Sequence, residues 1–174
     1  MRKKINEGKV HIYTGSGKGK TTACLGLGLR AASAGLRVCV FQFLKKRGTS
    51  AEVRLKHPRF KVVCFNHVHP LFGGDREKIK KEILRDIKKA KKALKSGRYD
   101  VVMLDEIINC VSGRFLPQKA VLELVRSKPK CVELILTGRG ATKRLIACAD
   151  YVSHIEKVKH PFDKGLLARH GIEY

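Results

Sequence analysis

The sequence lacks tryptophan, and only 6% of its residues are aromatic. A surface that stacks nucleic-acid bases would therefore have few residues to build on. No run approaches the roughly 18 consecutive apolar residues of a membrane-spanning helix. The basic start, residues 1–4, leads into no apolar segment of the kind found in signal peptides. We therefore expect a cytoplasmic protein that does not enter a membrane.

The six cysteines form no C-x-x-C pair, and no cluster of cysteine and histidine has the spacing of a zinc site. Most of them lie in apolar stretches, such as Cys39 between Val38 and Val40. We interpret them as small buried hydrophobic residues of a protein in a reducing cytosol.

Acidic residues are scarce, with 15 Asp and Glu against 38 Lys and Arg, so the formal net charge is +23. Such an imbalance points to an anionic partner: phosphate groups, nucleic acid or an acidic surface. The 174 residues, of which 43% are hydrophobic, are enough for one folded domain. No repeat, linker or change in composition marks a second one, so we predict a single domain over residues 1–174.

Predicted strands and helices alternate along the chain. The strands cover residues 10–13, 37–43, 60–65, 101–104, 131–137 and 151–158, and the helices cover residues 20–34, 75–96, 118–126 and 141–148. Asp75 is the expected N-cap of the long second helix, and Gly35 is the expected end of the first. This alternation predicts an α/β fold, a P-loop (RecA-like) domain with a mostly parallel sheet and helices on both faces.

A glycine-rich loop, residues 14–22 (TGSGKGKTT), follows the first strand and opens the first helix. Glycines in this context let successive backbone N–H groups turn toward phosphate oxygens, and the helix adds its positive end. Lys20 can reach the terminal phosphates, and the Thr21 hydroxyl can bind Mg²⁺ or Mn²⁺. Lys18 adds a second cation, while Thr14 stands where the usual P-loop pattern has glycine.

Two further segments follow apolar strands and complete the predicted nucleotide site. Asp105 and Glu106 end the strand at residues 101–104, where P-loop proteins carry an acid that holds the metal ion opposite the threonine of the loop. Arg139, in the segment TGRG at residues 137–140, comes after the next strand. Because ligands of open α/β sheets bind at the carboxyl ends of strands, Arg139 is placed to contact phosphate or base. A turn with a solvated arginine is an equally good interpretation from spacing alone.

His67 and His69 lie on one side of an extended segment, but no third metal ligand is evident near them. We interpret this segment as a plain loop.

The residues alone leave the reaction open. A glutamate beside the metal-binding aspartate, together with the positive charge and the lysine-rich helix at residues 75–96, would suit a P-loop ATPase that acts on nucleic acid. A nucleotide-binding regulator without turnover is a third possibility, although Lys20, Thr21, Asp105 and Glu106 argue against it.

Four segments together resemble the family of ATP:corrinoid adenosyltransferases. They are the loop at 14–22, Gln42 with Phe43, VVMLDE at 101–106 and TGRG at 137–140, and the tail adds VKHPFDKG at 158–165 and GIEY at 171–174. The Thr14 form of the P-loop is also typical of this family. The resemblance runs from about residue 8 to the end of the chain.

Such enzymes transfer the 5′-deoxyadenosyl group of ATP to the Co(I) of a reduced corrinoid and release triphosphate, in cobalamin biosynthesis or salvage. The resemblance implies a nucleotide that lies reversed in the P-loop, a homodimer, and an electron-donating flavoprotein as partner. It also implies that Phe72 crowds the lower face of the corrinoid, although the tryptophan that usually accompanies it is absent here.

The predicted site residues divide into four groups. The ATP-binding residues are Thr14, Gly15, Ser16, Gly17, Lys18, Gly19, Lys20, Thr21, Thr22 and Arg139. The metal-binding residues are Thr21, Asp105 and Glu106, the catalytic residues are Lys20, Thr21 and Glu106, and Phe72 is the corrinoid-binding residue.

Overall fold

The computed structural model describes residues 5–46, 48–68 and 73–173. Its centre is a six-stranded sheet with the order β3-β2-β4-β5-β1-β6, in which every neighbouring pair is parallel. The strands are β1 (Val10–Thr14), β2 (Val38–Gln42), β3 (Phe60–Cys64), β4 (Val101–Asp105), β5 (Glu133–Thr137) and β6 (Tyr151–His154). The predicted α/β fold class is confirmed, and the sheet is wholly rather than mostly parallel.

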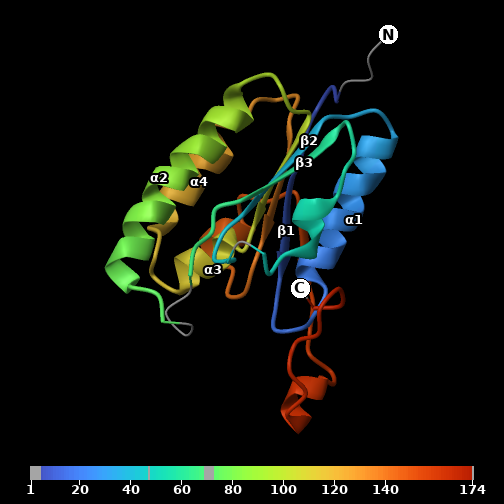
Figure 1. Cartoon of the computed structure of the whole chain (residues 1–174). Coiled ribbons are helices and arrows are strands. Elements are labelled where there is room, and N and C mark those ends of the chain that lie inside the picture. The colour runs from blue at the N-terminus through green and yellow to red at the C-terminus, as the bar shows by residue number, and fades with distance from the viewer. Residues whose placement is uncertain (1–4, 47, 69–72, 174) are drawn as a thin grey trace.

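Helices cover both faces of this sheet, with α1 on one side and α2 and α4 on the other (Figure 1). The helices are α1 (Lys20–Ser33), α2 (Arg76–Lys95), α3 (Ile107–Ser112), α4 (Gln118–Arg126) and α5 (Lys143–Ile146), and two 3-10 turns are η1 (Ala51–Arg54) and η3 (Pro161–Lys164). Asp75 caps α2 by accepting a hydrogen bond of 2.9 Å from the Lys78 N–H. Gly35 follows α1 with a φ of 93°, a conformation that glycine adopts without strain.

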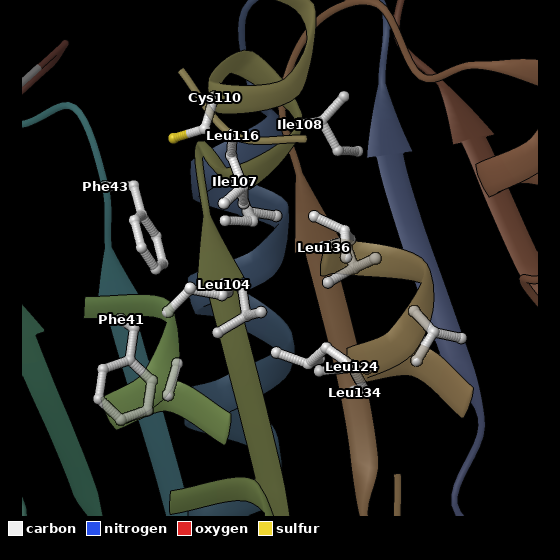
Figure 2. Close-up of a cluster of buried hydrophobic side chains, with 14 of the residues drawn as sticks. Phe41, Phe43, Leu104, Ile107, Ile108, Cys110, Leu116, Leu124, Leu134 and Leu136 are labelled. Atoms are coloured by element: carbon white, nitrogen blue, oxygen red, sulfur yellow. The ribbon is translucent and has the colours of Figure 1, made fainter. Parts of the chain in front are cut away.

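The hydrophobic core has two parts because successive side chains of a strand point to opposite faces of the sheet. Val102 and Leu104 of β4 belong to the larger part, under α2, α3 and α4, whereas Val101 and Met103 pack beneath α1. Figure 2 shows side chains of β2, β4 and β5 meeting those of α3 in the larger part. Burial on both faces explains why these strands read as continuous apolar runs.

Several sequence predictions are corrected by the structure. Helix α3 and the turn η3 were not predicted, and α5 is shorter than the expected helix at residues 141–148. Leu84, which shares the apolar spacing of α2, is exposed. Cys131 is exposed as well, whereas Cys24, Cys39 and Cys110 are buried as expected.

Across the described ranges, no helix is both long and apolar enough to cross a membrane.

His67 is a buried structural residue. Its Nδ1 accepts a hydrogen bond of 3.3 Å from the Leu44 N–H, so the ring proton lies on Nε2, which is 3.1 Å from Oδ2 of the buried Asp86. Arg85 and Lys89 also bind the Asp86 carboxylate. This network occupies both ring nitrogens, which supports the interpretation of a plain loop over that of a metal site. His69 lies outside the described residues.

We expect His67 to make the stability of the fold depend on pH. Burial lowers the pKa of His67 below its ordinary value of 6.5, although the Asp86 carboxylate partly opposes this shift. The unfolded chain therefore binds this proton more readily, and the free energy of unfolding should fall as the pH drops below 6.5. The slope from this one group is at most about 1.4 kcal/mol per pH unit.

Urea unfolding between about pH 5 and pH 8 would measure this slope. The His67→Gln variant should lose the part of the slope that belongs to this group. An identical pH dependence in both proteins would contradict the assignment of a neutral, buried His67.

Candidate nucleotide and metal site

Three loops meet at the carboxyl edge of the sheet, where β1, β4 and β5 end. Residues 15–19 connect β1 to α1, Glu106 separates β4 from α3, and residues 138–142 connect β5 to α5. Because β5 lies between β4 and β1, all three loops are neighbours in space. The structure thus brings together the segments that the sequence predicted to form one site.

The glycines of the predicted P-loop are required by its shape. Gly19 precedes α1 with a φ of 116°, and Gly15 has a φ of 105°. A side chain at Gly15 would also meet the Ile155 carbonyl oxygen at 2.3 Å, because the segment after β6 passes close to the loop. The Gly17 N–H donates a hydrogen bond of 2.8 Å to the same carbonyl. The tail of the chain therefore supports the loop from one side.

Thr14 has a structural role that explains its departure from the usual pattern. It is the last residue of β1 and is buried, and its hydroxyl accepts a hydrogen bond of 3.3 Å from the Ala141 N–H. Glycine could not make this contact. Thr14 thereby connects the P-loop to the loop that carries Arg139.

Lys20 lies inside the loop that it follows. Its Nζ donates a hydrogen bond of 2.6 Å to the Gly17 carbonyl, and only 7% of the residue is exposed. Burial lowers the pKa of Lys20, and the nearby Arg139 guanidinium lowers it further, whereas Glu106 and Asp105 act in the opposite direction. An anionic ligand in the loop would relieve the repulsion between these two cations.

Asp105 is the centre of a hydrogen-bond network and is fully buried. Its Oδ1 accepts hydrogen bonds from the Thr21 hydroxyl at 2.9 Å and from the Thr137 hydroxyl at 2.7 Å. Its Oδ2 lies 3.0 Å from the Lys45 ammonium and 3.4 Å from the Gln42 amide nitrogen. The carboxylate at the end of β4 is thus joined directly to the first turn of α1.

Glu106 has a left-handed backbone conformation, with a φ of 64°, which is uncommon for a residue with a long side chain. Its N–H donates a hydrogen bond of 2.9 Å to the Thr137 hydroxyl, which holds this conformation. Burial and the neighbouring Asp105 carboxylate raise the pKa of Glu106 to about 7. A backbone outlier and a perturbed carboxyl at one position are typical of a functional site.

A cavity of about 230 Å³ opens over the P-loop. Its walls come from residues 17–22 of the loop and helix, from Glu106 and Arg139, and from His160, Ile172 and Glu173 of the tail. The exposed Arg139 is held by its backbone N–H, which donates to the Asn109 side-chain oxygen. Arg139 lines the same cavity as Lys20.

Lys18, also predicted to bind phosphate, is paired with an acid of the tail. Its Nζ lies 2.9 Å from Oε1 of Glu173, which also binds Arg169. The tail segments that carried the family resemblance thus contact the P-loop directly.

The sequence did not predict all residues of the site. The unpredicted residues near Asp105 are Gln42, Lys45, Ser50, Glu52 and Thr137, and those of the cavity wall are His160, Ile172 and Glu173. Gln42 belongs to the family pattern, and it lies opposite Asp105 in the register of β2 and β4. Lys45 and Glu52 form an ion pair of 3.0 Å beside Asp105. The only sequence signal for them is a lysine and a glutamate shortly after a buried strand.

The donor set fits a hard divalent cation. The Thr21 hydroxyl and the Asp105 and Glu106 carboxyl groups supply only oxygen donors, which Mg²⁺ and Mn²⁺ prefer. Within the described ranges, no group of three or more His, Cys, Asp or Glu side chains could hold a metal ion alone. An ion here would need further oxygens, such as those of a bound triphosphate. Phe72, the predicted corrinoid contact, lies outside the described residues.

Comparison with known proteins identifies relatives along almost the whole chain. The sequence model of the family "ATP:corrinoid adenosyltransferase BtuR/CobO/CobP" matches residues 6–174. The corrinoid adenosyltransferase of Escherichia coli (strain K12) is 35% identical over 170 residues, which cover 96% of this chain and 86% of that protein. Those of Salmonella typhimurium and Pseudomonas aeruginosa are 34% and 30% identical, with 96% of this chain covered in each case and 86% and 84% of the relatives.

Proposed function

The chain belongs to the ATP:corrinoid adenosyltransferase family, and from this premise we propose that the cavity over the P-loop holds the triphosphate of ATP beside a divalent cation. The enzyme transfers the adenosyl group of ATP to a corrinoid. In our proposal, Thr21, Asp105 and Glu106 bind Mg²⁺ or Mn²⁺, and the backbone N–H groups of residues 14–22 surround the phosphates. The observation that carries the proposal is the 2.9 Å hydrogen bond between the Thr21 hydroxyl and the buried Asp105 carboxylate.

The chemistry of the transfer suits this set of residues. Co(I) is a strong nucleophile and attacks the ribose 5′-carbon, while the bond from that carbon to the phosphate oxygen breaks. The nucleophile carries no proton, so the chain needs no general base for the attack. Its task is to orient the reactants and to stabilise the negative charge that grows on the departing triphosphate.

Cationic groups of this chain are placed for that task. Lys20, Arg139 and Lys18 all line the cavity, and Lys18 pairs there with Glu173. The bound metal ion would supply further positive charge to the phosphate oxygens. In this proposal Glu106 serves the metal ion or its surroundings and does not activate water.

The remaining parts of the proposal come from the family resemblance. They are a reduced Co(I) corrinoid as substrate, Phe72 at its lower face, a homodimer and an electron-donating flavoprotein. The proposed location, the cytoplasm, comes from the composition of the chain. Six free cysteines, three of them buried, are in keeping with a reducing compartment.

Phosphorus NMR of the reaction mixture tests the proposed function. With MgATP and a chemically reduced corrinoid, we expect intact triphosphate in a one-to-one ratio with adenosylated corrinoid. Without the corrinoid, the ATP signals should persist.

A P-loop ATPase would give the opposite result. It would transfer the terminal phosphoryl group to water and release orthophosphate and ADP. Orthophosphate formed without corrinoid and stimulated by DNA or RNA would overturn the proposal. The Glu106→Gln variant should slow the metal-dependent reaction without changing which bond breaks.

A further inference from the structure

The Lys45 ammonium stands between two carboxylates of different exposure. Its Nζ lies 3.0 Å from Oδ2 of Asp105 and 3.0 Å from Oε1 of Glu52. The Asp105 side chain is 1% exposed, whereas 23% of the Lys45 side chain and 17% of the Glu52 side chain are exposed. Lys45 is thus the cation nearest to the fully buried carboxylate, and Glu52 lies on its outer side.

The backbone after β2 directs Lys45 to this place. The Phe43 N–H donates a hydrogen bond of 3.0 Å to the Asp105 carbonyl, which continues the pairing of β2 with β4. Leu44 then adopts a left-handed conformation with a φ of 51°, and its N–H binds His67. Both contacts hold the turn that places Lys45 over the end of β4.

Glu52 is held in position by partners other than Lys45. The Gln42 amide nitrogen donates a hydrogen bond of 2.7 Å to Oε1 of Glu52. The Ser50 hydroxyl donates in turn to the side-chain oxygen of Gln42 at 2.8 Å. Glu52 can therefore keep Lys45 as a partner even when Asp105 binds something else.

Burying a carboxylate without a nearby cation destabilises the folded protein, and Lys45 supplies that cation to Asp105. The same ammonium would repel a divalent cation that approaches Asp105 by itself. A metal ion that arrives with a triphosphate carries enough negative charge with it to offset this repulsion. The arrangement thus discriminates between a free metal ion and a metal–nucleotide complex.

We propose that Lys45 is the resident counter-ion of Asp105, which excludes a free divalent cation and remains with Glu52 when the metal ion enters together with the nucleotide. This inference rests on the proposed function, because it requires Asp105 and Thr21 to form the metal site. Lys45 acts through Asp105 and is a positioning residue.

Binding of Mn²⁺ to the full-length protein, followed by electron paramagnetic resonance without nucleotide, tests the proposal. We expect the Lys45→Met variant to bind free Mn²⁺ at least about 10-fold more tightly than the unmodified protein, because the repulsion is gone while the stem of the side chain remains. Lys45→Arg, which keeps the charge, should behave as the unmodified protein. Lys46→Met is the matched control, because Lys46 is the exposed neighbour in the chain.

The Glu52→Gln variant should weaken the binding of Mn²⁺ rather than strengthen it. Lys45 would lose its second partner and stay with Asp105, so Mn²⁺ should bind several-fold more weakly in the presence of ATP. Circular dichroism would show whether each variant is folded, and the Glu52 result tests the proposal independently if Lys45→Met does not fold. Unchanged or weaker binding of free Mn²⁺ to a folded Lys45→Met variant would overturn the proposal.

The Thr21→Ala variant separates this inference from the proposed function. If Mn²⁺ binding in the presence of ATP does not depend on Thr21, the metal site itself is misassigned. If it does depend on Thr21 but Lys45→Met binds free Mn²⁺ no more tightly, only the counter-ion role fails.

Discussion

Replacing Lys20 by alanine is expected to weaken the binding of MgATP, and to slow turnover, by about 10- to 150-fold. Lys20 is buried inside the P-loop, where its Nζ donates a hydrogen bond of 2.6 Å to the Gly17 carbonyl. A charge-assisted hydrogen bond to phosphate contributes roughly 1.5–3 kcal/mol, and each 1.36 kcal/mol corresponds to about a factor of ten. Isothermal titration calorimetry with MgATP measures the loss in binding.

Lys88→Ala provides the control for this experiment. Lys88 lies on the exposed face of α2 and does not line the cavity over the P-loop, so its removal should leave MgATP binding unchanged. Near-normal binding and turnover in the Lys20→Ala variant would contradict the P-loop assignment. A loss of similar size in both variants would indicate a general effect of net charge rather than a specific contact.

The parts of the fold that could be predicted are those with local signals. Gly35 and Asp75 mark helix ends through backbone requirements that a few neighbouring residues set, and both were predicted correctly. Helix α3 was missed because it has six residues, most of them apolar, and is separated from β4 by Glu106 alone. A segment so short and so uniformly apolar has no polar face that would reveal its period.

The residues of the site also differ in whether a local sequence signal predicts them. Residues 14–22 could be identified because their chemistry follows from a continuous stretch of chain. The contact of Lys45 with Asp105 joins residues 60 positions apart, and it depends on the register that pairs Gln42 with Asp105. No local pattern encodes that register. Thr14 is an intermediate case. The sequence shows that it replaces the usual glycine of a P-loop, but not that its hydroxyl accepts a hydrogen bond from the Ala141 N–H.

The strongest test of the metal site is Asp105→Asn, which changes one atom and leaves the shape of the side chain unchanged. All four neighbours of the Asp105 carboxylate donate hydrogen bonds: Thr21, Thr137, Lys45 and Gln42. An amide has one accepting oxygen and one donating nitrogen, so two of these donors must face the nitrogen. Only the threonine hydroxyls can rotate and accept instead, because the Lys45 ammonium and the Gln42 amide nitrogen only donate.

The amide nitrogen of Asp105→Asn should therefore turn toward Thr21 and its oxygen toward Lys45. In this arrangement the buried Thr137 hydroxyl accepts from the amide and its own proton loses the Asp105 acceptor, whereas Lys45 retains Glu52. The free energy of unfolding should therefore fall by about 1–3 kcal/mol. At the metal position, however, a donating nitrogen replaces an anionic oxygen. Binding of Mn²⁺ in the presence of ATP should then fall by about 100-fold or more, because a charged ligand of the ion is lost.

Urea unfolding and electron paramagnetic resonance with MnATP would measure these two effects separately. Asp163→Asn is a suitable control, since Asp163 forms a half-exposed ion pair with Lys157 outside the network. Such pairs contribute at most about 1 kcal/mol, and metal binding should not respond to this change. If Asp105→Asn loses stability but still binds MnATP normally, Asp105 is a structural acid of β4, and the metal ion must bind through other groups. A large loss of metal binding in a folded protein would support the assignment of the Asp105 carboxylate, whose Oδ1 binds the Thr21 hydroxyl, to the metal site.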